Sequence, residues 1–121
     1  YTLNQYARWG AALDDARHLS DGEAVALAKD GAFLSRHIQV PTRGVALFIN
    51  AFNFPMWGML EKFAPTFLAG MPSIVKPATA TSYVAEACVR LIVESGLVPE
   101  GALQLIIGGT GFTRAPCDTC E

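Results

Sequence analysis

The chain has 121 residues, of which 51% are hydrophobic, and its mean hydropathy of +0.30 is high for so small a globular unit. Nine basic and 11 acidic residues give a formal net charge of −2, without the basic stripe that nucleic acid requires. Polar residues interrupt every long apolar stretch before it reaches the roughly 20 residues of a membrane-spanning helix. We therefore expect neither a nucleic-acid partner nor a membrane span.

Residues 1–43 are predicted to be a helical and extended lead-in. Mixed polar and apolar positions in residues 1–31 favour one or two helices, with a turn near Asp21-Gly22. From Gly31 the pattern becomes extended and leads into Pro41-Thr42-Arg43-Gly44, a turn between two extended segments.

Residues 44–111 begin with a strand and a helix. The apolar run Val45-Ala46-Leu47-Phe48-Ile49 predicts a parallel strand buried on both faces. Pro55 suits the first turn of a helix, where its missing N–H costs nothing, and the apolar face of that helix extends to Leu68. Gly70 and Pro72 are expected to end it.

A second strand and helix follow, and then a third strand. Ser73-Ile74-Val75 predicts the strand, and Thr81 or Ser82 can cap a helix that extends to Gly96. Leu103-Gln104-Leu105-Ile106-Ile107 predicts the last strand. The order strand–helix–strand–helix–strand predicts an α/β fold, a partial Rossmann-like βαβαβ unit.

Asn53 follows the first of these strands, and Lys76, 23 positions later, ends the second. Carboxyl ends of parallel strands meet at one edge of the sheet, where such folds bind ligands. Asn53 is a candidate donor to an oxyanion, and its alternative role is a helix N-cap. Lys76 is a candidate contact to the ribose or phosphate of a nucleotide, and its alternative role is a solvated surface lysine.

Gly108-Gly109-Thr110-Gly111 predicts a turn in which backbone N–H groups can approach a pyrophosphate. Its spacing does not fit G-x-G-x-x-G, so a Rossmann enzyme with that fingerprint is disfavoured. The pair Cys117 and Cys120 has C-x-x-C spacing, but no second pair or nearby histidine completes a zinc site, so no metal is predicted. His18 and His37 have no identifiable catalytic partner, and we expect surface or packing roles for them.

Three cysteines make an odd number, and Cys88 lies far in sequence from the other two, so no disulfide framework is indicated. Tyr1 is not followed by the charged start and apolar run of a secretion signal. We therefore expect a cytoplasmic protein.

The segment from about Gly31 to Gly109 resembles the coenzyme-binding region of the aldehyde dehydrogenase superfamily. The resemblance is carried by Ile49-Asn50-Ala51-Phe52-Asn53-Phe54-Pro55 and by Trp57-Gly58-Met59-Leu60-Glu61-Lys62. More narrowly, the pattern INAFNFPxWGMLEKxAPTxLAGxPxIVKPATAT resembles the dehydrogenase domain of bifunctional oxepin-CoA hydrolase/semialdehyde dehydrogenases of phenylacetate degradation.

This resemblance implies a fragment of an NADP-dependent enzyme that oxidises an aldehyde, such as a CoA-linked semialdehyde, to a carboxylic acid, and that is a homo-oligomer when full length. It implies that Asn53 donates to the thiohemiacetal oxyanion and that Lys76 contacts the adenosine ribose. Many NAD-preferring members have Glu three residues after that lysine, where this chain has Thr79. A carboxylate would repel a 2′-phosphate, so Thr79 permits NADP, and NAD stays possible. The implied coenzyme contacts are Ile49, Asn50, Ala51, Phe52, Lys76, Pro77, Ala78, Thr79, Gly108 and Gly109.

The family's nucleophilic Cys and general-base Glu lie downstream of residue 121, and none of Cys88, Cys117 and Cys120 matches the nucleophile. The chain alone is therefore expected to be inactive, and residues 112–121 depart from the family pattern as an atypical tail. Two alternatives remain open: a non-catalytic nucleotide-binding or subunit-interaction module, and a relative of the acyl-CoA-forming reductases of the same superfamily.

Overall fold

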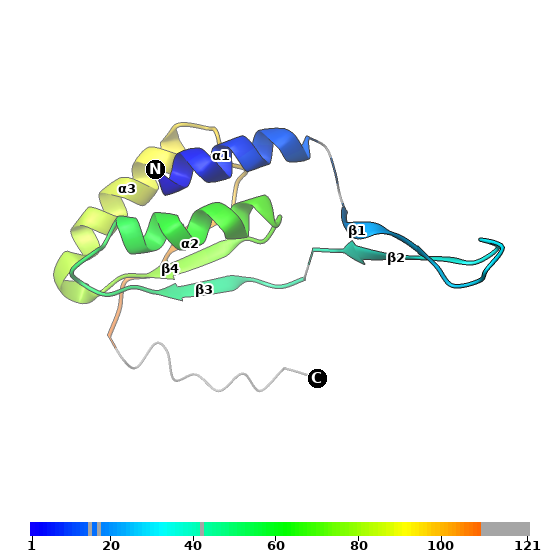
Figure 1. Cartoon of the computed structure of the whole chain (residues 1–121). Helices are drawn as coiled ribbons and strands as arrows, with labels where there is room; N and C mark the ends of the chain where they lie inside the picture. The colour runs from blue at the N-terminus through cyan, green and yellow to red at the C-terminus, as the bar shows by residue number, and fades with distance from the viewer. Residues whose placement is uncertain (15, 17, 42, 110–121) are drawn as a thin grey trace.

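The computed structural model describes residues 1–14, 16, 18–41 and 43–109 (Figure 1). Three helices lie on one side of a small parallel sheet, and a two-stranded hairpin projects away from them. The elements in chain order are α1 (Thr2–Leu13), β1 (Leu19–Ala26), β2 (Leu34–Gln39), β3 (Ala46–Ile49), α2 (Trp57–Leu68), β4 (Ser73–Lys76), the single 3-10 turn η1 (Thr79–Thr81), α3 (Ser82–Glu94) and β5 (Leu103–Leu105).

The strands β3, β4 and β5 form one parallel sheet in that spatial order, connected by α2 and α3. Ala46 lies opposite Ser73, and Ser73 lies opposite Leu103, so the three strands begin in register. This arrangement confirms the predicted α/β fold with a Rossmann-like βαβαβ unit. The last strand is shorter than expected, since the ladder ends at Leu105 rather than at Ile107.

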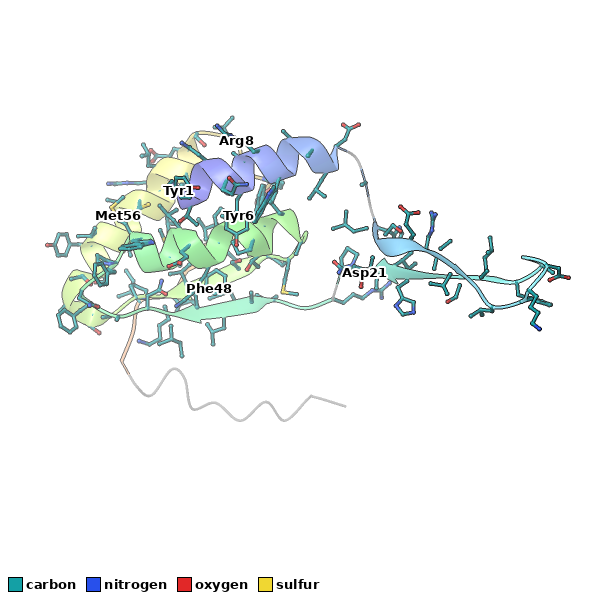
Figure 2. All side chains as sticks on the ribbon, in the orientation of Figure 1. Tyr1, Tyr6, Arg8, Asp21, Phe48 and Met56 are labelled. Atoms are coloured by element: carbon teal, nitrogen blue, oxygen red, sulfur yellow. The ribbon has the colours of Figure 1, made fainter. Side chains whose placement is uncertain are left out.

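The core lies between this sheet and the helices α2 and α3. Met59 of α2 and Val75 of β4 are fully buried, and Phe48 lies between β3 and α2 (Figure 2). Alternate side chains of a strand point to opposite faces, so these residues define one covered face of the sheet. The cluster comprises Phe48, Met59, Phe63, Val75, Cys88, Val89 and Leu103.

The opposite face of β3 is open. Leu47 and Ile49 are 58% and 60% exposed, so the prediction that this strand is buried on both faces is wrong for the described chain. The reason is that both crossover helices contribute their apolar faces to the same core, and the described residues offer no layer for the other side.

The lead-in differs in part from its prediction. Residues 2–13 are a helix as expected, but residues 19–26 form β1, which pairs antiparallel with β2. Gly22, predicted near a turn, instead lies in a bulge between Asp21 and Val25 and has φ of +79°. The paired residues of β1 and β2 lie 8 to 20 positions apart in sequence, from Ala26 opposite Leu34 to Leu19 opposite Gln39. Local propensity does not indicate this pairing.

The helix ends follow most of the predicted stop signals. Gly70 and Gly96 have φ of +73° and +67°, conformations that glycine adopts without strain, and they follow α2 and α3 closely. Pro55 was expected in the first turn of its helix, but it lies before α2, which begins at Trp57 with Met56 as its N-cap. Thr81, one of the two expected caps, is at the N-cap of α3 without a side-chain cap bond. Within the part of the chain that the structure describes, no helix has the length and apolar character to cross a membrane.

Candidate functional site

The carboxyl ends of the three parallel strands lie side by side. Ile49 of β3 is opposite Lys76 of β4, and the backbone N–H of Asn50 donates to the carbonyl of Lys76 at 3.0 Å. The N–H of Ile106 donates to the carbonyl of Val75 at 2.9 Å, which continues the same edge to β5. The two segments expected to bind the coenzyme, 49–52 and 76–79, therefore start from neighbouring strands at one edge of the sheet.

Asn50 is a buried amide at this edge, with 5% of its surface exposed. Its side-chain oxygen accepts a hydrogen bond from Lys62 Nζ at 2.8 Å, and the Ile49 carbonyl lies 3.4 Å from the same nitrogen. The Asn50 Nδ2 group is buried and has no partner among the described residues. Lys62 lies in the motif that carries the family resemblance, but no role was predicted for it, because the sequence does not indicate a contact between residues 12 positions apart.

Asn53 lies in the connection from β3 to α2, where it is exposed together with Ala51 and Phe52. The N-cap position of α2 is Met56, and no side chain makes a cap hydrogen bond there. The alternative in which Asn53 caps the helix is therefore wrong, because α2 begins three residues later than that role requires. Among the described residues, the exposed side-chain amide of Asn53 makes no hydrogen bond.

Lys76 is half-buried at the end of β4, and within residues 1–109 as described it makes no side-chain hydrogen bond or ion pair. Pro77 behind it is fully buried and fixes the chain as it leaves the strand. Ala78 is half-buried, and Thr79 is exposed at the start of η1. The arrangement presents one cation and one neutral hydroxyl group, without a carboxylate next to them in the chain.

Gly108 and Gly109 follow β5, and Gly109 is exposed with open space around the position of a Cβ. Thr110 and Gly111, the rest of the predicted turn, lie outside the described residues, as do Cys117, Cys120 and the tail 112–121. The two described glycines leave the sheet from the same edge as Asn50 and Lys76, because β5 is parallel to β4.

Cys88 lies inside α3 and belongs to the core. Burial raises the pKa of its thiol, which lowers the fraction present as nucleophilic thiolate. Both His18 and His37 are exposed, and no group of three metal-ligating side chains occurs among the described residues.

An apolar cavity of about 530 Å³ lies away from the strand edge, between α1, α2 and α3. Its wall includes Leu3 and Tyr6 of α1, Phe67 of α2 and Leu91 of α3. It has almost no polar lining, so it offers no group that could orient a nucleotide or stabilise a developing charge.

Comparison with known proteins gives a consistent result. The family model described as "Aldehyde dehydrogenase family" matches residues 2–118. The 3,4-dehydroadipyl-CoA semialdehyde dehydrogenase of Aromatoleum evansii is 50% identical over 109 residues, which are 90% of this chain and 21% of that enzyme. The D-glyceraldehyde dehydrogenase (NADP(+)) of Thermoplasma acidophilum is 34% identical over 109 residues, 88% of this chain and 20% of that enzyme. The chain thus spans about a fifth of the length of these relatives.

Two solved structures show the same arrangement of the chain. The succinic semialdehyde dehydrogenase of Streptococcus pyogenes, in complex with NADP+, superposes with a TM-score of 0.68 over 93% of this chain and 23% of that one, at 20% identity. The succinate-semialdehyde dehydrogenase of Burkholderia pseudomallei gives a TM-score of 0.59 over 91% of this chain and 21% of that one, at 25% identity. At 20% identity, the similarity to the Streptococcus pyogenes structure supports the fold alone.

Proposed function

The chain belongs to the aldehyde dehydrogenase family, and on that premise we propose that residues 44–111 are part of the coenzyme-binding domain of an NADP-dependent semialdehyde dehydrogenase. The observation that carries the proposal is the shared strand edge, where the hydrogen bond from Asn50 to Lys76 joins the two predicted contact segments. In this proposal residues 1–43 are a lead-in, and residues 112–121 are a tail outside the family pattern.

Asn53 is assigned to the reacting carbonyl. Its side-chain amide is exposed in the connection between β3 and α2 and is not used as a helix cap. An amide N–H can stabilise an oxyanion by donating a hydrogen bond, and it does so without changing its own protonation state. Asn53 would hold the substrate oxygen while the carbonyl carbon is attacked.

The coenzyme is assigned to the backbone and side chains of 49–52, to 76–79 and to Gly108-Gly109. The fit rests on charge: the Lys76 cation has no acidic neighbour in the turn 77–81, and Thr79 is neutral, which suits a 2′-phosphate on the ribose. NAD remains compatible, because neither residue excludes a free 2′-hydroxyl. When bound, the nicotinamide supplies the hydride acceptor for aldehyde oxidation.

The proposed substrate is a CoA-linked semialdehyde of aromatic (phenylacetate) catabolism, oxidised to the carboxylic acid. The support is the 50% identity to an enzyme named for 3,4-dehydroadipyl-CoA semialdehyde, together with the narrower sequence resemblance to dehydrogenases of phenylacetate degradation. A cytoplasmic location accompanies this assignment, and the free thiol of Cys88 is compatible with a reducing compartment.

We also propose that the full-length protein is a homo-oligomer and that the hairpin of β1 and β2 takes part in its assembly. The hairpin stands clear of the helices with its side chains on both faces, as around Asp21 in Figure 2. Large apolar residues on it are exposed, which favours a covered position in an assembly. These residues are Leu19, Val25, Leu27, Phe33, Leu34, Ile38 and Val40.

The 121-residue chain by itself is not expected to oxidise aldehydes. Its described cysteine is buried in the core, with a raised thiol pKa, and the family's nucleophile and general base are expected downstream of residue 121. A non-catalytic nucleotide-binding module remains the alternative. The two differ in whether Asn53 matters for turnover once the catalytic segments are supplied.

A chimera tests the proposal. In it, this chain replaces the matched segment of the Aromatoleum evansii enzyme, which supplies the remaining four-fifths of the polypeptide. The proposal predicts that the chimera oxidises 3,4-dehydroadipyl-CoA semialdehyde with NADP+, measured by the absorbance of the reduced coenzyme, with the unaltered enzyme as control. A folded chimera that binds neither NADP+ nor NAD+ contradicts it.

A further inference from the structure

Lys62 connects helix α2 to the end of strand β3. Its ammonium donates to Asn50 Oδ1 at 2.8 Å and lies 3.4 Å from the Ile49 carbonyl. These two acceptors belong to consecutive residues at the point where the chain leaves the sheet. One cation from the helix therefore holds both a side chain and a backbone group of the strand end.

The ammonium also determines which way the Asn50 amide faces. A lysine ammonium has only donors, so the oxygen of the amide must be the atom that faces it. The Asn50 Nδ2 donor is therefore directed elsewhere, and it is buried without a partner among the described residues. Among the described residues, Lys62 is the one hydrogen-bond partner of this side-chain amide, while the backbone N–H of Asn50 is bonded to the Lys76 carbonyl.

The connection that follows Asn50 has little other support. Ala51, Phe52 and Asn53 are exposed, and the next backbone hydrogen bond along the chain is from the Gly58 N–H to the Phe54 carbonyl. Asn50 is thus the last anchored residue before Asn53. A change in its position would be transmitted directly to the three residues assigned to the coenzyme and the substrate oxygen.

We propose that Lys62 is a positioning residue of the coenzyme site, acting through Asn50 to hold the 51–53 connection in one geometry. The expected effect on coenzyme binding rests on the proposed function. The effect of Lys62 on the geometry of residues 51–53 can be measured in the chain without coenzyme. Lys62 touches neither coenzyme nor substrate in this assignment. Its effect is on the residues that do.

The test uses the full 121-residue chain and hydrogen exchange resolved to single amides by mass spectrometry with electron-transfer fragmentation, a method that tolerates self-association. Lys62→Met keeps the length of the side chain and removes its donors, whereas Lys62→Arg keeps a cation with donors. Lys29→Met is the matched control, because Lys29 is exposed in the hairpin and makes no side-chain hydrogen bond within the described residues.

Lys62→Met should speed exchange of the Asn50 amide by about tenfold, while the Ile106 amide in the same sheet keeps its rate. Lys62→Arg should restore most of the protection, and Lys29→Met should change nothing. The Lys62→Met chain should bind NADP+ roughly threefold to tenfold more weakly than the unsubstituted chain does.

An unchanged Asn50 rate in Lys62→Met overturns the proposal, as does an equal acceleration at Asn50 and Ile106, which would indicate a general loss of stability. Failure of Lys62→Arg to restore protection also overturns it. If NADP+ protects neither 49–53 nor 76–79 in the unsubstituted chain, the coenzyme assignment fails instead. The coenzyme-free rates then still decide whether Lys62 positions this connection.

Discussion

The backbone N–H of Asn50 donates to the carbonyl of Lys76 at 3.0 Å, one step beyond the last paired residues of β3 and β4. This hydrogen bond brings together two segments that lie more than 20 positions apart in sequence and that are both proposed to contact the coenzyme. The predictions that follow test this edge and the core that supports it.

Asn53→Ala in the chimera should lower kcat by roughly 10²–10³-fold, the loss expected on removal of one oxyanion donor. The KM for NADP+ should change little, because the amide is assigned to the substrate oxygen. Steady-state kinetics with both substrates varied measures the two effects separately.

The stability of the Asn53→Ala chimera serves as the control. Asn53 caps no helix in the structure, so the free energy of unfolding should stay within about 0.5 kcal/mol of the parent. A retained kcat together with a loss of about 1 kcal/mol would assign the residue to a helix cap and remove its catalytic role.

Met59→Ala should destabilise the full chain by about 2–5 kcal/mol, because Met59 is fully buried at the centre of the core cluster. Leu91→Ala on α3 is the control, since Leu91 is 71% exposed and should change stability by no more than about 0.5 kcal/mol. Urea denaturation of the three proteins compares them. Equal effects at the two sites would mean that the core is not where the structure places it.

The full chain should be weakly stable or self-associate, because the open face of β3 and the hairpin expose large apolar side chains. Size-exclusion chromatography and binding of an apolar dye test this expectation. Phe33→Ser in the hairpin should reduce both self-association and dye binding, whereas Lys29→Ser in the same hairpin should reduce neither. A monodisperse monomer with a cooperative melt and no dye binding would contradict the prediction.

Cys88 should make the chain less stable as the pH rises above about 8.5, the usual pKa of an unfolded thiol. Burial raises the pKa of this thiol in the folded state, so between the two pKa values the unfolded chain has lost a proton that the folded chain retains. The free energy of unfolding therefore falls with pH in this window. Thermal melts of the parent and of Cys88→Ala should diverge there, and parallel curves would argue against a buried thiol.

Much of the fold could be predicted from residue pattern alone. Apolar runs such as 45–49 and the stop signals Gly70 and Gly96 are local, and the structure agrees with them closely. Strand β1 was missed because all of its residues are exposed, so its sequence lacks the apolar alternation that marks a half-buried strand. The open face of the sheet was missed because an apolar run in the sequence does not indicate whether one or both faces of its strand are covered.

The candidate site also contains both residues that the sequence pattern indicates and residues that it does not. Asn53 and Lys76 were candidates because the sequence places one shortly after a predicted strand and the other at the end of the next. In the structure Lys76 ends β4 beside Ile49 of β3, and Asn53 lies four residues beyond Ile49. Their roles in binding and catalysis stay predictions. Lys62 could not be found from its position on a helix, because its partner is determined by how α2 packs on the sheet. The role of Asn53 as a cap was a reasonable local alternative, and the start of α2 at Trp57 rules it out.

The central claim is that this strand edge binds NADP through Lys76 and Thr79, and the most direct measurement is fluorescence titration of the chimera with NADPH and NADH. Lys76→Ala should weaken NADPH binding with a loss that diminishes at high salt, because salt screens the attraction between the half-buried cation and the 2′-phosphate. Thr79→Glu should penalise NADPH far more than NADH, since the new carboxylate repels only the phosphorylated ribose. Equal effects of each substitution on the two coenzymes, or no effect at all, would contradict the account and leave Lys76 as a surface lysine.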